Sequence, residues 1–123
     1  MINGIGIDLI SIDKIKKAME MRGEKFYLRV FSETESDTIE KIKGRNEKRA
    51  FEKAAGYFAA KEAFLKALGK GLFSIPLNKI KISNDESGRP YINLDSGLAD
   101  NISAKVSITH DKGFACAVVI INL

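Results

Sequence analysis

One stretch of this chain, residues 47–68, keeps a helical pattern of apolar side chains along its whole length. Phe51, Phe58 and Leu65 recur every seven residues, and alanines fill the positions between them. Gly69-Lys70-Gly71 follows at once, and Pro76 makes a resumption of the helix unfavourable. The pattern therefore predicts a long helix with an apolar face that another layer of structure must cover.

The other segments are shorter, and several alternate with a period of two, which is typical of strands. We predict an N-terminal strand over residues 2–9 and two hairpins, formed by 79–83 with 91–94 and by 105–109 with 114–121. The last strand is apolar on both faces, so it should be central or covered. The order of these elements predicts an α+β fold, a single domain over residues 1–123 with the long helix packed on a mainly antiparallel sheet.

Capping residues mark the start of two short helices. Ser11 is a suitable N-cap for a helix that ends near Gly23. Ser32 and Glu35 form a capping-box pattern, which predicts a helix that runs to Gly44. A further short helix is expected over residues 96–101.

The composition excludes several classes of protein. A chain of 123 residues, 45% of them hydrophobic, is long enough for one domain with a real core. Cys116 is the only cysteine, so we expect neither an internal disulfide nor a structural zinc site, and we interpret it as a core residue. Asp8 interrupts the only N-terminal apolar stretch, and no apolar run reaches membrane-spanning length, so a cytoplasmic protein is expected.

Asp8 is an acidic residue within an apolar strand, on the same face as Gly4 and Gly6. It could lie just beyond the strand and cap a turn, because aspartate is common in turns. It could also bind a hard cation such as Mg²⁺, since carboxylates suit that ion. The glycines beside it leave room for another body to approach.

The long helix carries Glu62 and Lys66 four residues apart, in the favourable orientation for an ordinary exposed ion pair. The alternative interpretation makes Glu62 a second metal carboxylate and the nearby lysines phosphate ligands. His110, the only histidine, is expected at a hairpin turn, either half-buried or facing a ligand. The residue pattern leaves these alternatives open.

Basic residues are concentrated in two regions, and the net charge of +4 favours anionic partners. Residues 41–70 hold nine Lys or Arg and three Glu, and residues 12–29 are also basic. A nucleic-acid-binding module would explain this charge, but no aromatic residues are interleaved with Lys or Arg on a predicted strand surface. Phe26 lies beside Lys25 and Arg29, where it could be an apolar anchor of the basic face or a core residue.

Together these motifs resemble the holo-[acyl-carrier-protein] synthase family, the small bacterial 4′-phosphopantetheinyl transferases. The matching blocks occur in the family order and span nearly the whole chain. They are residues 4–9 (GIGIDL), 29–31 (RVF), 56–69 (GYFAAKEAFLKALG), 88–90 (GRP) and 106–110 (VSITH).

The resemblance implies transfer of 4′-phosphopantetheine from coenzyme A to a serine of apo acyl carrier protein, with release of 3′,5′-ADP, in lipid metabolism. It implies Mg²⁺ held by Asp8 and Glu62, with Asp8, Glu62 and Lys66 as catalytic residues. Lys61, Lys66, Gly69 and His110 match positions near coenzyme A. A non-catalytic interaction protein, in which Glu62 and Lys66 are only an ion pair, is the alternative.

The family also implies a cyclic homotrimer with sites at the subunit boundaries, and a neighbouring subunit could then cover the glycine face beside Asp8. It implies an acidic carrier protein as partner, with no nucleic acid and no membrane involved. The positions implied for docking the carrier are Lys14, Arg22, Lys25, Phe26 and Arg29. Relatives often carry arginine where this chain has Tyr57 and Lys14. These exchanges remove a planar cation that binds anions well, so they bear on coenzyme A affinity and carrier choice.

Overall fold

The computed structural model describes residues 2–69, 74–94 and 101–122. Its helices are α1 (Ile12–Arg22), α2 (Glu24–Val30), α3 (Glu33–Lys43) and α4 (Glu47–Leu68), with a 3₁₀ turn, η1 (Leu77–Lys79). Its strands are β1 (Ile2–Ser11), β2 (Ile80–Asn84), β3 (Pro90–Leu94), β4 (Ser103–Asp111) and β5 (Phe114–Asn122). The predicted helix over residues 96–101 lies outside the described residues except for position 101.

The five strands form one sheet in the order β1-β5-β4-β3-β2, and every neighbouring pair is antiparallel. The α+β fold and both predicted hairpins are confirmed, and β5 is central between β1 and β4. The second hairpin turns through Lys112 and Gly113, which both have positive φ, so its strands run closer to the turn than expected. His110 therefore lies within β4 and not in the turn itself.

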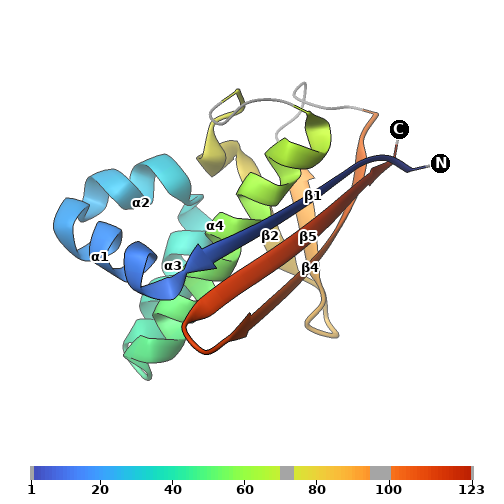
Figure 1. Cartoon of the computed structure of the whole chain (residues 1–123). Coiled ribbons are helices and arrows are strands. Elements are labelled where there is room, and N and C mark those ends of the chain that lie inside the picture. The colour runs from blue at the N-terminus through green and yellow to red at the C-terminus, as the bar shows by residue number, and fades with distance from the viewer. Residues whose placement is uncertain (1, 70–73, 95–100, 123) are drawn as a thin grey trace.

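The long helix α4 packs across β1 and β5, as Figure 1 shows. Two glycines of β1 make this close approach possible. A Cβ atom at Gly4 would lie 2.0 Å from the Ala67 carbonyl oxygen, and one at Gly6 would lie 1.9 Å from that of Ala63. The expectation that a neighbouring subunit covers the glycine face is therefore wrong, because the chain's own helix fills that space.

The opposite face of β1 is the apolar surface left open. Ile5, Ile7 and Leu9 are 66%, 62% and 63% exposed, and no helix lies in front of β1 and β5 in the described part of the chain (Figure 1). An uncovered apolar strand face of this kind is typical of an interaction surface. Within the described ranges, none of the helices is long and apolar enough to cross a membrane.

The helix starts agree with their capping residues. Ser11 accepts a hydrogen bond from the Lys14 amide, and Ser32 and Glu35 form the complete capping box. Helix α2, which begins directly after Gly23 has ended α1, is not among the helices predicted from the sequence. Gly23 has φ +55°, so one glycine turns the chain between two helices.

Candidate active site

Asp8 is the centre of a charged cluster where β1 meets α4. It pairs with Ala117 inside the sheet and is only 7% exposed, so the turn-cap interpretation is wrong. The Lys66 ammonium lies 3.1 Å from Asp8 Oδ1 and donates to the Ile7 carbonyl oxygen at 3.0 Å. We call Asp8, Glu62 and Lys66 the carboxylate cluster, since strand pairing and helix packing bring these three side chains together.

In the carboxylate cluster two carboxyl groups lie beside one ammonium, so negative charge is in excess when both carboxyl groups are ionised. Burial, and then the neighbouring Asp8 carboxylate, raise the pKa of Glu62 from 4.5 to about 7, while Lys66 acts in the opposite direction. A protonated Glu62 can donate a hydrogen bond to Asp8. When both groups are ionised, Asp8 Oδ2 is buried without a hydrogen-bond partner. A proton or a cation therefore completes this cluster.

The donor set fits Mg²⁺ bound together with a phosphate ligand. Mg²⁺ is commonly held by one or two carboxylates, with the remaining positions filled by water and substrate phosphates. No group of three or more His, Cys, Asp or Glu side chains suited to a metal occurs among the described residues. Asp8 and Glu62 would thus hold the ion from one side and leave its other positions open.

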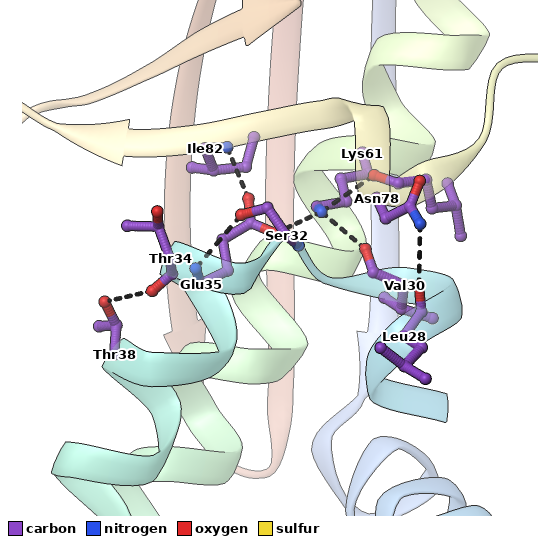
Figure 2. A network of polar contacts seen from close by, with 10 residues as sticks. Leu28, Val30, Ser32, Thr34, Glu35, Thr38, Lys61, Asn78 and Ile82 are labelled. Carbon is purple, nitrogen blue, oxygen red and sulfur yellow. Dashed lines mark hydrogen bonds and ion pairs between the residues drawn. The ribbon is translucent and has the colours of Figure 1, made fainter. Parts of the chain in front are cut away.

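Lys61 lies elsewhere, in the protein core (Figure 2). Its ammonium is 0% exposed, pairs with Glu35 Oε1 at 2.5 Å, and donates to the carbonyl oxygens of Val30 and Leu77. All three positions on the ammonium are thus used by the protein itself. The expectation that Lys61 contacts coenzyme A is therefore wrong in this structure, because its charge is neutralised inside the fold.

A second feature is a cavity of about 270 Å³ where α4 faces β2, β3 and β4, which we call the β4-side cavity. His110 lines it, and its Nδ1 lies 3.4 Å from Glu52 Oε2. The cavity combines basic side chains with flat and apolar ones, a mixture suited to an anionic ligand that carries a ring. The residues that line the cavity include Arg49, Glu52, Lys53, Tyr57, Asn84 and His110.

Sequence reasoning missed Arg49, Lys53 and Asn84 as members of a site. The available signal was the spacing of Arg49 and Lys53, which places two cations on one face of the predicted helix. Asn84 could not be found in this way, because only the folding of the β2–β3 hairpin brings it to α4.

The carboxylate cluster and the β4-side cavity lie on opposite sides of α4. Lys53 and Glu62 are nine residues apart, about two and a half helical turns, so their side chains point in opposite directions. The sheet contacts also separate the two features along the helix axis: Gly6 of β1 lies against Ala63, whereas Gly56, about two turns earlier, lies against Ile108 of β4. Within one chain, these two features therefore face away from each other.

The predicted docking residues lie around α1 and α2. Lys14, Arg22, Lys25 and Arg29 are exposed, and the last three line a surface hollow together with Phe26. Phe26 is 6% exposed and contacts Phe31 edge to face, so it is a core residue at the floor of that hollow.

Gly69 ends α4 in the left-handed conformation, and its amide donates back to the helix. This amide is therefore occupied by helix termination, the simpler of the two roles suggested by its sequence context.

The fold and the carboxylate cluster define a class: a small α+β protein that presents two neighbouring carboxylates and a lysine where a strand edge meets a long helix. The 4′-phosphopantetheinyl transferase superfamily model matches residues 4–119 of the chain. Holo-[acyl-carrier-protein] synthase of Clostridium tetani is 42% identical, over 99% of this chain and 97% of that protein. The Staphylococcus carnosus synthase is 44% identical, over 99% and 98%.

Solved structures agree. The Bacillus anthracis holo-(acyl-carrier-protein) synthase in complex with CoA (3′,5′-ADP) superposes with a TM-score of 0.83 at 36% identity, covering 98% of this chain and 96% of that one. The Helicobacter pylori synthase in complex with coenzyme A gives 0.82 at 37% identity, covering 96% and 99%. The chain therefore belongs to the holo-[acyl-carrier-protein] synthase family of the 4′-phosphopantetheinyl transferase superfamily, a family of transferases.

Proposed function

We propose that this protein transfers the 4′-phosphopantetheine arm of coenzyme A to a serine hydroxyl of an apo acyl carrier protein. The bond between the serine oxygen and phosphorus forms, the phosphorus–oxygen bond to 3′,5′-ADP breaks with its electron pair leaving on 3′,5′-ADP, and the serine proton is released to water. Family membership supports this activity, as do the coenzyme A complexes of two related synthases.

The observation that carries the proposal is the unpartnered Asp8 oxygen beside Glu62. We propose that Mg²⁺ occupies this place, held by the two carboxylates. When bound, the ion would neutralise the pyrophosphate oxygens of coenzyme A and orient them for displacement. Glu62 must lose its proton to act as a ligand, and Lys66 favours that loss.

Lys66 supplies a fixed cation next to the same carboxylates. Its contacts with Asp8 Oδ1 and the Ile7 carbonyl hold the ammonium at the strand edge, while 57% of its side chain stays exposed. A phosphate held at the carboxylate cluster would lie beside this charge. Lys66 therefore binds the transferred phosphoryl group and stabilises the charge on it.

The carrier protein docks, in this proposal, on the basic surface of α1 and α2. Lys14, Arg22, Lys25 and Arg29 give this surface its charge. An acidic carrier would approach it with favourable long-range electrostatics, which raises the association rate and orients the partner.

The β4-side cavity receives the nucleotide end of coenzyme A, with His110 among its binding residues. One chain cannot present this cavity and its own carboxylate cluster to one small ligand, because they lie on opposite sides of α4. A head-to-tail contact between subunits would bring the carboxylate cluster of one subunit next to the β4-side cavity of the next. Contacts of this kind can close into rings. Of such rings we propose the cyclic homotrimer with shared sites that the family resemblance implies, and the exposed β1 face of Ile5, Ile7 and Leu9 supplies apolar surface for it.

The activity is tested by intact-mass spectrometry of an apo acyl carrier protein incubated with this protein, coenzyme A and Mg²⁺. We expect the carrier to gain the mass of one phosphopantetheine, and EDTA to abolish the gain. A gain that persists in EDTA would contradict the metal, and no gain with several carriers, including the one from the same organism, would contradict the activity.

The shared site is tested by mixing two inactive variants, Glu62→Gln and His110→Ala. Each intact site then needs a cluster from one variant and a cavity from the other, so a random mixture regains about one site in four. Exchange of subunits is verified by mass spectrometry of the intact assembly. Mixed assemblies without activity would overturn the shared site.

A further inference from the structure

Two cations of α4 face the β4-side cavity, one helical turn apart. Arg49 and Lys53 are separated by four residues, and both line the cavity. The carboxylate in this lining belongs to Glu52, which lies beside His110 instead. The part of the cavity near Lys53 is therefore positively charged.

Lys53 is held in place by two neutral groups. Its ammonium donates to Asn84 Oδ1 at 3.2 Å and lies 5.3 Å from the centre of the Tyr57 ring. The Asn84 amide nitrogen donates in turn to the Gly88 carbonyl oxygen at 2.9 Å, which fixes the direction of Oδ1. Neither partner cancels the charge of Lys53, so the ammonium is oriented and still able to bind an anion.

The surroundings of Lys53 favour an anionic ligand for a second reason. Partial burial, and then the positive charge of Arg49, lower the pKa of Lys53. A bound anion would relieve both effects, because it neutralises two neighbouring cations at once. The Tyr57 ring, only 4% exposed, forms a rigid support beneath the ammonium.

We propose that Lys53 determines specificity by binding the ribose 3′-phosphate of coenzyme A. This inference rests on the proposed function, in which the pyrophosphate lies at the carboxylate cluster of the neighbouring subunit. The phosphate that remains for the β4-side cavity is the one on the ribose. In this chain Lys53, supported by the Tyr57 ring, supplies the cation for this phosphate that an arginine at position 57 could supply.

The test compares coenzyme A with dephospho-coenzyme A, which lacks only the 3′-phosphate. For each enzyme, kcat/KM is measured with both substrates, and their ratio reports recognition of that phosphate. We expect Lys53→Met to reduce the ratio by about 10- to 100-fold, the range for a hydrogen bond between charged groups. Activity with dephospho-coenzyme A should change little, which also shows that the variant is folded.

Two further variants serve as controls for charge and for position. Lys53→Arg keeps a cation and should retain most of the ratio. Lys48→Met removes an exposed lysine of the same helix that does not line the cavity, and its ratio should equal that of the unmodified protein. An unchanged ratio in Lys53→Met, or an equal loss with both substrates, would overturn the role of Lys53 while the transfer activity stands. Failure of the unmodified protein to use coenzyme A would instead overturn the proposed function.

Discussion

Two lysines of helix α4 lie five residues apart, and each pairs with a carboxylate from another element. The two pairs differ strongly in burial and in hydrogen bonding. Lys61 and Glu35 are 0% and 1% exposed, and the distance between their charged atoms is 2.5 Å. Lys66 and Asp8 are 57% and 8% exposed, at 3.1 Å. The same chemical pairing thus occurs once inside the core and once at the edge of the sheet.

The difference teaches what each pair can do. In the core pair, Glu35 Oε1 also accepts from Ser32 N, and its Oε2 accepts from Ile82 N, so every charged atom has a protein partner (Figure 2). In the edge pair, Asp8 Oδ2 has no hydrogen-bond partner and Lys66 faces solvent. A fully satisfied pair connects parts of the fold, whereas an incompletely satisfied pair can bind a ligand.

The largest expected effect comes from breaking the core pair. Lys61→Met leaves the Glu35 charge buried without its partner, and we expect the free energy of unfolding to fall by about 3–5 kcal/mol. Chemical denaturation measures this loss.

The double variant Lys61→Met/Glu35→Gln is the matched control for that substitution. It leaves no unpaired charge, so it should recover part of the stability lost by the single variant. A single variant that loses less than about 1 kcal/mol would show that the core pair contributes no more than a surface pair.

Asp8→Asn tests the edge pair from its acidic side. It removes one of the two carboxylates proposed to hold Mg²⁺, so turnover should fall on the order of 10²- to 10³-fold, the range typical for one group that stabilises transition-state charge. The Mg²⁺ concentration required for half-maximal activity should rise as well. Titration of turnover with Mg²⁺ measures both effects.

The control for this substitution is Asp37→Asn, which changes an exposed acid of α3. It should leave turnover and Mg²⁺ dependence as they are. If Asp8→Asn behaved in the same way, Asp8 would have no part in metal binding.

The stability of the metal-free protein should depend on pH through Glu62. Because its pKa is raised from 4.5 to about 7 in the folded state, the folded protein binds this proton more tightly than the unfolded chain does. The resulting stabilisation is fully present below pH 4.5 and is lost as the pH rises through 7. Thermal unfolding of the metal-free protein and of Glu62→Gln across this range measures it.

The unmodified protein should lose stability relative to Glu62→Gln as the pH rises through 7, since the glutamine side chain of the variant cannot titrate. A difference that stays constant with pH would mean that the Glu62 carboxyl is not perturbed. Added Mg²⁺ should stabilise the unmodified protein more at high pH than at low pH, because the metal competes with the same proton.

Local patterns in the sequence predicted those parts of the structure that local interactions decide. The capping box of Ser32 and Glu35 and the full extent of α4 are of this kind. The same Glu35 also binds Lys61 and the Ile82 amide, and those contacts depend on segments far apart in the chain. No spacing rule reveals which lysine of the motif points inward, so the sequence alone does not separate Lys61 in the core from Lys66 in the site.

In the candidate site, too, local patterns predict some features and long-range packing decides the others. The motifs identify Asp8, Glu62 and Lys66, and the structure brings them together. Residue parity correctly places Gly4 and Gly6 on the face of Asp8, but it cannot distinguish a neighbouring subunit from α4 as the body that packs there. The β4-side cavity forms only when the β2–β3 hairpin reaches α4, so it has no signature in any single segment.

The smallest effect on stability should come from Lys66→Met, the same substitution as in the core pair made five residues later. The Lys66 side chain is mostly exposed, so losing its contact with Asp8 should cost no more than about 1 kcal/mol. Turnover should nevertheless fall strongly, because the phosphoryl group loses its fixed cation. The two Lys→Met variants, measured side by side, should thus show opposite profiles: Lys61→Met mainly unfolds more easily, whereas Lys66→Met stays folded and transfers slowly. Equal losses of stability in both would mean that burial does not separate the two pairs.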